Sequence, residues 1–286
     1  MDIAIASGKG GTGKTTLSLC IGEYFAGKGI PTAILDCDVE EPNVNLFLKS
    51  PVNNILDTSV LIPSVNDSLC TGCGECERIC EFSCIVLIKG KPLVLPEMCH
   101  SCGGCTLICP EKAISEIRRI TGIIEAGEIR GIKYAGGRLN VGEAMSPPLI
   151  KEVKKYYTGS KIRIIDSPPG TTCPVIESVK NCDLIILTGE PTPFGLNDLK
   201  LAVDMARMLE IPFGIVENKE NKNNTSLKEF CKKEKIDLIT SIPETRAIAE
   251  GYSTGDPVPR VMELYPDRLD AIAEFISVKH LQGKNR

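Results

Sequence analysis

A glycine-rich turn near the start of the chain constrains the fold more than any other segment. Residues 8–15 read Gly-Lys-Gly-Gly-Thr-Gly-Lys-Thr and fit the pattern G-x-x-x-x-G-K-[ST]. A buried-strand pattern over residues 2–6 precedes the turn, and apolar residues at helical spacing over residues 14–26 follow it. Residues 31–35 read as a second strand. The segment therefore predicts a βαβ unit and a parallel sheet.

The residue types in this turn are those that nucleotide phosphates require. Glycines let backbone N–H groups converge on phosphate oxygens, and the start of the next helix adds partial positive charge. Lys14 can reach the terminal phosphates, and the Thr15 hydroxyl can ligate Mg²⁺. An ordinary glycine-rich turn is the alternative, which the flanking strand and helix disfavour. We predict that ATP and Mg²⁺ bind at Gly8, Lys9, Gly10, Gly11, Thr12, Gly13, Lys14, Thr15 and Thr16.

The rest of the chain divides into a cysteine-rich stretch and a return to α/β periodicity. Short β-like pieces broken by glycines are expected over residues 119–142. Beyond them we expect helices at 147–157, 195–210, 225–234 and 267–281, and strands at 161–165, 183–188, 213–217 and 236–240. The predicted fold is α/β, a mostly parallel sheet flanked by helices, formed by residues 1–59 and 119–286. A small α+β domain at residues 60–118 interrupts it.

Cysteine is the unusual part of the composition, because most of the 14 cysteines lie between Cys70 and Cys109. Such a cluster in a reducing compartment indicates metal ligands rather than disulfides. Cys70, Cys73, Cys76 and Cys80 follow the spacing C-x2-C-x2-C-x3-C, and the four cysteines from Cys99 to Cys109 repeat it. This doubled run resembles a bacterial two-cluster ferredoxin, in which the fourth cysteine of each run reaches the other cluster. Zinc is the alternative, but zinc sites usually have two C-x2-C pairs separated by a longer gap, not runs of three closely spaced cysteines. We assign one 4Fe–4S cluster to Cys70, Cys73, Cys76 and Cys109, and the other to Cys80, Cys99, Cys102 and Cys105.

Two positions depart from the ferredoxin pattern. Cys80 is followed by Glu81, whereas Cys109 is followed by the usual proline. Cys84 stands where such domains usually have a small residue. It is interpreted as a small buried side chain, with an additional metal ligand as the alternative.

Lys9 and four later segments resemble one class of ATPases. Residues 9–16 resemble the deviant Walker A motif of the MinD/Mrp/nitrogenase-iron-protein class, because a second lysine precedes the glycines. Residues 34–38 (Ile-Leu-Asp-Cys-Asp) resemble its second acidic motif, and residues 164–170 (Ile-Ile-Asp-Ser-Pro-Pro-Gly) resemble its switch II segment. Residues 216–219 resemble its base-recognition segment, and residues 242–250 its late strand–loop–helix. The matches span the α/β part of the chain.

The resemblance implies a homodimer with nucleotide at the interface. Lys9 would cross that interface and stabilise charge on the transferred phosphoryl group, and Asp38 would orient the attacking water. A solvated lysine at position 9, and loop capping by Asp36 or Asp38, are the alternatives. The implied catalytic residues are Lys9, Lys14 and Asp38; the implied Mg²⁺ site is Thr15, Asp36 and Asp166; Asn218 and Pro243 would bind the base.

Charge and hydropathy exclude several other classes. The net charge of −4 provides no basic excess for binding nucleic acid. Apolar runs fall far short of a membrane span, and the N-terminus does not read as a secretory signal. We therefore expect a cytoplasmic protein with no membrane insertion and no nucleic-acid partner.

Three functions are compatible with these motifs. We favour ATP-gated electron transfer through two 4Fe–4S clusters to a partner redox or metallocluster protein. The first alternative is an assembly or carrier ATPase for metalloclusters. Cys173, seven residues after Asp166, favours it as a candidate extra ligand in switch II, whereas the lack of a late C-x-x-C pair disfavours it. The second is a MinD-like spatial organiser, although residues 267–281 suit packing on the sheet better than membrane binding.

Overall fold

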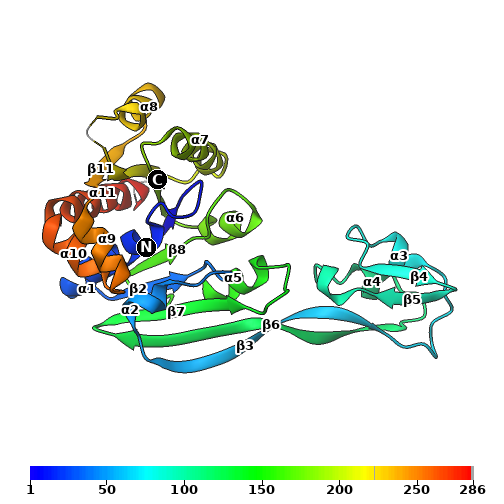
Figure 1. Cartoon of the computed structure of the whole chain (residues 1–286). Helices are drawn as coiled ribbons and strands as arrows, with labels where there is room; N and C mark the ends of the chain where they lie inside the picture. The colour runs from blue at the N-terminus through cyan, green and yellow to red at the C-terminus, as the bar shows by residue number, and fades with distance from the viewer. Residues whose placement is uncertain (222, 285–286) are drawn as a thin grey trace. The chain divides into compact units, whose positions relative to one another are not determined.

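A single mixed layer of strands organises the α/β part of the protein. The computed structural model describes residues 1–221 and 223–284. Its nine-stranded sheet has the order β11-β10-β9-β1-β8-β2-β7-β6-β3 (Figure 1). Every pairing from β11 through β7 is parallel. The strands are β1 (Asp2–Ala6), β2 (Thr32–Asp36), β3 (Val52–Val65), β6 (Ile114–Ile129), β7 (Ile132–Leu139), β8 (Ile162–Asp166), β9 (Leu184–Gly189), β10 (Phe213–Glu220) and β11 (Leu238–Pro243). The expected mostly parallel sheet is confirmed.

The central strands are apolar along nearly their whole length because helices cover both faces of the sheet. β2, β8 and β9 are buried at every residue. In β1, Ile3 and Ile5 join a core cluster with Leu19 and Ile21 of the first helix. This burial anchors the strand ends from which the functional loops leave.

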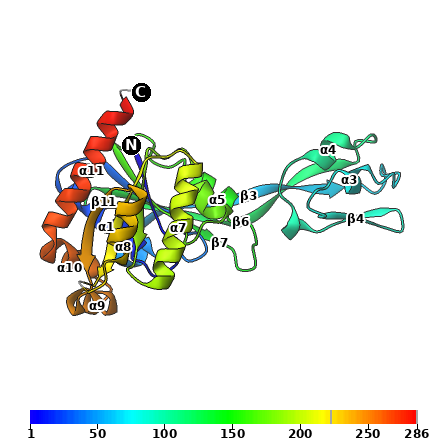
Figure 2. The ribbon, with the colours of Figure 1, turned by 90° about the horizontal axis from the view of Figure 1, so that it is seen from above.

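Helices pack on the two faces in two groups. On one face α1 contacts α10 and α11, and on the other α6 contacts β1 and β8 while α7 contacts β9 (Figures 1 and 2). The helices of this part are α1 (Lys14–Gly27), α2 (Val44–Leu48), α5 (Pro147–Val153), α6 (Cys173–Val179), α7 (Pro193–Met208), α8 (Ser226–Glu234), α9 (Arg246–Ser253), α10 (Pro257–Leu264) and α11 (Pro266–Lys284).

The last helix, α11, packs on the sheet as expected. Leu269, Ile272 and Ile276 are buried in the main core cluster. Its apolar face is therefore used within the protein. Among residues 1–221 and 223–284, no helix is both long enough and apolar enough to span a membrane.

A second compact unit contains the cysteine runs. It comprises residues 56–123 and 139–149, whereas residues 1–55, 124–138 and 150–286 form the first unit. The second unit thus extends beyond residues 60–118. Its core groups Ile62, Ile85 and Ile114 with Cys76, Cys84 and Cys99. Its further elements are α3 (Glu75–Arg78), β4 (Ile85–Ile88), β5 (Lys91–Val94), a 3₁₀ turn (Pro96–Met98) and α4 (Gly104–Ile108), with β4 and β5 antiparallel.

One expectation about local structure was wrong, and one expected helix is shorter than predicted. Residues 119–142 form two long strands instead of short pieces, because Gly127 and Gly136 mark close approaches of neighbouring groups rather than strand breaks. A Cβ on Gly127 would lie 2.0 Å from the carbonyl oxygen of Pro51, and one on Gly136 would lie 2.0 Å from the Tyr134 hydroxyl. The helix expected over 147–157 ends at Val153, and Tyr157 then has a φ of 53°.

Candidate functional site

The loop between β1 and α1 owes its shape to its glycines. Gly11 and Gly13 have φ values of 74° and 90°, which side chains with a Cβ rarely adopt. A Cβ on Gly8 would lie 2.0 Å from the backbone oxygen of Asp198 in α7. No side chain caps the N-terminus of α1. The N–H groups of its first turn thus have no side-chain partner and can bind an anion.

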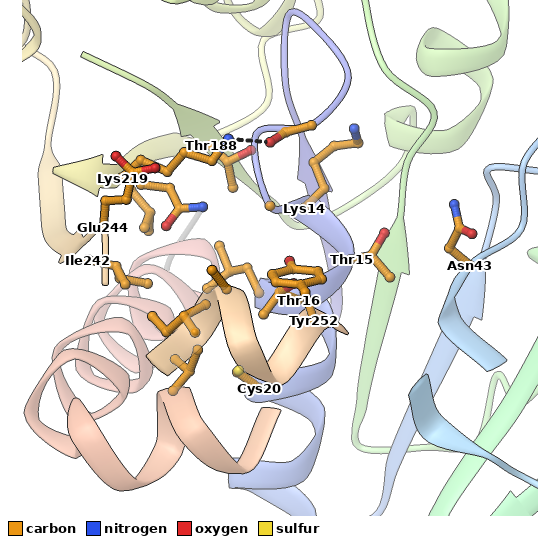
Figure 3. A pocket seen from close by; sticks show the side chains of 18 of the residues that line it. Lys14, Thr15, Thr16, Cys20, Asn43, Thr188, Lys219, Ile242, Glu244 and Tyr252 are labelled. Atoms are coloured by element: carbon orange, nitrogen blue, oxygen red, sulfur yellow. Dashed lines mark hydrogen bonds between the residues drawn. The ribbon is translucent and has the colours of Figure 1, made fainter. Parts of the chain in front are cut away.

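This loop forms one wall of a cavity of about 540 Å³, a size typical of ligand pockets. Lys14, Thr15 and Thr16 extend from the start of α1, and Ile242, Glu244 and Tyr252 line the cavity from the C-terminal part of the chain (Figure 3). The cavity thus has a polar end at the glycine-rich loop and a more apolar end near α9.

Two buried carboxylates lie side by side at the ends of β2 and β8. Asp36 and Asp166 are partners in the parallel register of these strands. Thr15 Oγ1 donates to Asp166 Oδ2 at 2.7 Å, and Ser18 Oγ donates to Asp166 Oδ1 at 2.9 Å. Burial raises the pKa of both carboxyls. A cation bound beside Thr15 would counter that effect.

Asp36 and Asp166 have different local roles. The two carboxylate oxygens of Asp36 accept backbone N–H groups of Asp38 (3.1 Å) and Val44 (2.9 Å). They hold the loop after β2 in place, which is the capping role weighed from the sequence. Asp166 instead bonds to side chains of α1, so it is the carboxylate more directly linked to the glycine-rich loop.

Lys14 and Asp38, which carry opposite charges, both line the cavity. Burial lowers the pKa of Lys14, and the charges of Asp166 and Asp38 partly oppose this shift. Burial, with the charge of Asp166, raises the pKa of Asp38 to about 7. A carboxyl with that pKa can exchange a proton or orient a water near neutral pH.

Lys9 is held by a glutamate that follows β9. Its Nζ lies 2.8 Å from Glu190 Oε2, and Lys219 bonds the other oxygen of the same carboxylate. The side chain of Lys9 is 32% exposed, whereas that of Glu190 is 8% exposed. Burial alone would raise the pKa of Glu190, but the bonds from Lys219 and Lys9 outweigh it and the pKa is lowered. Lys9 is therefore ordered but remains accessible.

The two residues expected at the base, Asn218 and Pro243, both line this cavity. Asn218 Nδ2 donates to the carbonyl of Thr12 at 2.8 Å, which fixes the orientation of its amide. Pro243, the last residue of β11, also lines the cavity. Sequence reasoning missed Phe47 and Tyr252, which also line the cavity and whose rings meet edge to face with centroids 5.8 Å apart. Only the position of Tyr252 just after the 242–250 segment could have pointed to it.

The cysteines of the second unit line two separate small pockets. One contains Cys70, Cys73, Cys76 and Cys109. The other contains Cys80, Cys84, Cys99, Cys102 and Cys105. The two pockets separate the cysteines in the way that the sequence assignment does, with Cys84 in addition. Among residues 1–221 and 223–284, no three His, Cys, Asp or Glu side chains are grouped tightly enough to hold a single metal ion.

The loops around the two pockets repeat one backbone geometry. Gly72 and Ser101, each two residues after the first cysteine of its run, both have positive φ, at 71° and 56°. Gly74 and Gly103, each just after the second cysteine of its run, also have positive φ values, of 81° and 72°. Ser101 N also donates to Cys99 Sγ at 3.4 Å. Such turns direct successive N–H groups toward one centre, as anion-binding loops do.

The cysteines outside the two runs differ in exposure. Cys173 is exposed at the first position of α6, whereas Cys20, Cys37, Cys182 and Cys231 are buried. Burial raises the pKa of the Cys231 thiol to about 11 and that of Cys182 to about 12. Among these five, Cys173 is thus the one that an external metal or partner can reach.

The strand, loop and helix around Lys14, together with the carboxylate beneath Thr15, define a P-loop nucleotide-binding protein. The chain belongs to the CobQ/CobB/MinD/ParA nucleotide-binding family, whose domain model matches residues 3–258. It is thus a P-loop NTPase of the MinD/ParA type. The membership expected from Lys9 and the later segments is confirmed for the nucleotide-binding fold.

Similar proteins cover most of the chain. An uncharacterized protein of Methanocaldococcus jannaschii is 36% identical over 279 residues, 96% of this chain and 98% of its own. An iron-sulfur cluster carrier protein of Pyrococcus horikoshii is 25% identical over 278 residues, 90% of this chain and 78% of its own. The septum site-determining protein MinD of P. horikoshii, solved with Mg-ADP, superposes with a TM-score of 0.61 at 18% identity, covering 97% and 98% of the two chains. This last likeness concerns the fold.

Substituting Gly13 by alanine is expected to weaken ATP binding at least about tenfold and to lower stability by about 1–3 kcal/mol. Gly13 has a φ of 90°, and a Cβ there would lie 2.2 Å from Asn218 Nδ2. Calorimetric titration with Mg-ATP and thermal unfolding measure both effects. Gly27→Ala is the matched control, because nothing lies within 4 Å of its Cβ. Equal ATP affinity in the Gly13→Ala and Gly27→Ala variants would contradict the assignment of the glycine-rich loop as the ATP-binding site.

Proposed function

We propose that this protein is a Mg²⁺-dependent ATPase that carries two 4Fe–4S clusters and uses its nucleotide state to control electron transfer to a partner metalloprotein. The observation that carries the proposal is the division of the cysteines of the second unit into two pockets, in the same chain as a nucleotide cavity. A nucleotide can influence the clusters only by binding two conformations with different affinity.

The nucleotide cavity supplies each group that phosphoryl transfer needs. Lys14 and the N-terminus of α1 would bind the phosphates, and Thr15 with Asp166 would hold Mg²⁺, directly or through water. Asp38 would orient the attacking water. Asn218 and Pro243 would contact the base. The accessible side chain of Lys9 would leave Glu190 and reach the nucleotide of a second copy of the chain in a homodimer.

The two cysteine pockets fit 4Fe–4S clusters in their donor chemistry. Each offers four thiols from spacings typical of such clusters. N–H groups donate to Cys80, Cys99 and Cys109 sulfurs at 3.3–3.4 Å, and hydrogen bonds of this kind tune cluster potential. When bound, the clusters would supply one-electron transfer at low potential.

A second candidate function is the assembly or transfer of metalloclusters. Two observations favour it: the exposed position of Cys173 at the start of α6, and the likeness to an iron-sulfur cluster carrier protein. A spatial organiser is the weaker reading, because the apolar face of α11 is buried against the protein core.

Protein purified without oxygen tests the proposal directly. We expect about eight iron and eight sulfide per chain and a brown colour that reductant bleaches. Redox titration without nucleotide, with Mg-ADP and with a non-hydrolysable ATP analogue should give different midpoint potentials. Colourless or zinc-loaded protein would contradict the clusters. Two clusters with identical potentials in all three states would contradict nucleotide control and favour the carrier function.

A further inference from the structure

The second cysteine pocket contains one thiol more than a 4Fe–4S cluster requires. Cys84 lines it together with Cys80, Cys99, Cys102 and Cys105. Cys84 is 3% exposed, and its sulfur lies 3.3 Å from the sulfur of Cys80. Cys99 is its other interacting thiol. The first pocket is lined by four cysteines, so the two pockets differ in their number of thiols.

An internal repeat makes this difference easy to interpret. Cys84 follows Cys80 by four residues, just as Ala113 follows Cys109. In both turns the N–H of the fourth residue donates to the cysteine sulfur, at 3.4 Å and 3.3 Å. The third residue has positive φ in both, 51° at Ser83 and 49° at Lys112. The two backbones match, so the added thiol is what distinguishes this turn from its repeat.

We propose that Cys84 is a reserve ligand that can take the place of Cys80 on the iron-sulfur cluster of the second pocket. The inference rests on the proposed function, since it requires that this pocket hold a cluster. Thiolate sulfur is the donor that such iron prefers. The Cys84 sulfur lies 3.3 Å from the Cys80 sulfur, so a small movement of the Cys84 side chain would bring it to the place that Cys80 leaves. The first pocket has alanine at the equivalent position, so its cluster has no such substitute.

The exchange conserves atoms and charge. With a cluster bound, Cys84 would become the ligand as its thiol proton passed to the departing Cys80 sulfur, across the 3.3 Å contact between the two sulfurs. One thiolate ligand would replace another, with no electron gained or lost. The second pocket could therefore change one ligand of a bound cluster while three cysteines kept their places, whereas the first pocket has only four cysteines.

Iron content and electron paramagnetic resonance of anaerobic full-length variants test this inference. Cys80→Ala is expected to keep about eight iron per chain and to show no three-iron signal. Cys80→Ala/Cys84→Ala is expected to lose at least about one iron and to show that signal, since a three-cysteine site holds its fourth iron poorly. Cys84→Ala alone is expected to match the unsubstituted protein.

The first pocket supplies the matched controls. Cys109→Ala should lose iron as the double variant does, and adding Ala113→Cys to it should restore the iron. Mg-ATP binding, measured on each variant, reports whether the nucleotide-binding unit has folded, and the iron kept by the unaltered pocket reports whether the cysteine-containing unit has folded. Equal iron in Cys80→Ala and Cys80→Ala/Cys84→Ala would overturn the role of Cys84. If the unsubstituted protein contains no iron, the proposed function itself is overturned, so the two failures are distinguishable.

Discussion

Replacing Lys9 with alanine is expected to lower ATP turnover at least about a hundredfold while changing the affinity for ATP less than about threefold. A lysine that meets the transferred phosphoryl group only when two chains associate stabilises the transition state more than the bound nucleotide. Its loss therefore lowers kcat rather than raising Kd. Phosphate release and calorimetric titration with Mg-ATP measure the two quantities.

The Lys9→Ala chain is expected to fold normally because loss of the Lys9 side chain leaves no buried charge unpaired. Glu190 keeps its ion pair with Lys219, and Lys9 itself is partly exposed. Lys155→Ala is the matched control, since Lys155 is an exposed lysine that pairs with Glu152. Unchanged turnover in Lys9→Ala would exclude any catalytic role for this lysine.

Mixing variants tests whether Lys9 acts across a dimer. Chains with Lys9→Ala and chains with Asp38→Asn should both be inactive alone. In a mixed dimer, the site on the Lys9→Ala chain keeps its own Asp38 and receives Lys9 from the other chain. Half of the dimers then have one active site of two, so about a quarter of the original activity should return in a symmetric dimer. No recovery, with mixed dimers shown to form, would place Lys9 in its own site.

The sequence predicted the nucleotide-binding half well because its motifs are local. β1, the glycine-rich loop and α1 are consecutive, so one pattern specifies strand, turn and helix together. Asp36 and Asp166 could be brought together only by knowing that parallel strands end at the same sheet edge. That inference came from resemblance, and the register of β2 with β8 gives its physical basis.

The remaining features depend on tertiary contacts that leave little trace in sequence. Gly127 and Gly136 look like strand breakers, yet they sit inside strands because backbone or a tyrosine hydroxyl occupies the space beside them. Phe47 lies on a five-residue helix with too short a pattern to predict. The pairing of Lys9 with Glu190 joins residues far apart in the chain. The four-residue offsets after Cys80 and Cys109 were visible, but their equivalence needed the backbone angles.

Asp38→Asn is expected to lower turnover about a hundredfold or more, because an amide cannot orient the attacking water by accepting its hydrogen bonds as an ionised carboxylate does. The pKa of Asp38 is about 7, so in the unsubstituted protein kcat/KM should rise about tenfold per pH unit below pH 7 and level off above it. Assays from pH 5.5 to 8.5 measure this limb. A profile that is flat across pH 7 would contradict Asp38 as the group that must ionise.

Asp38→Asn is also expected to stabilise the nucleotide-free protein, by an amount that grows as the pH rises. Burial raises the pKa of Asp38 from its ordinary value of 3.8 to about 7, so the folded chain holds this proton more tightly than the unfolded chain. Folding stability is therefore lost as the pH rises from about 4 to about 7. Asparagine carries no charge and avoids this loss of stability. Because Asp38 is partly exposed to solvent, the loss is limited to about 2 kcal/mol. Thermal unfolding should thus show a higher Tm for Asp38→Asn at pH 8 and nearly equal values at pH 4.5. A Tm difference that does not change with pH would mean that the carboxyl ionises freely in the folded protein, and that its position in the cavity costs the fold nothing.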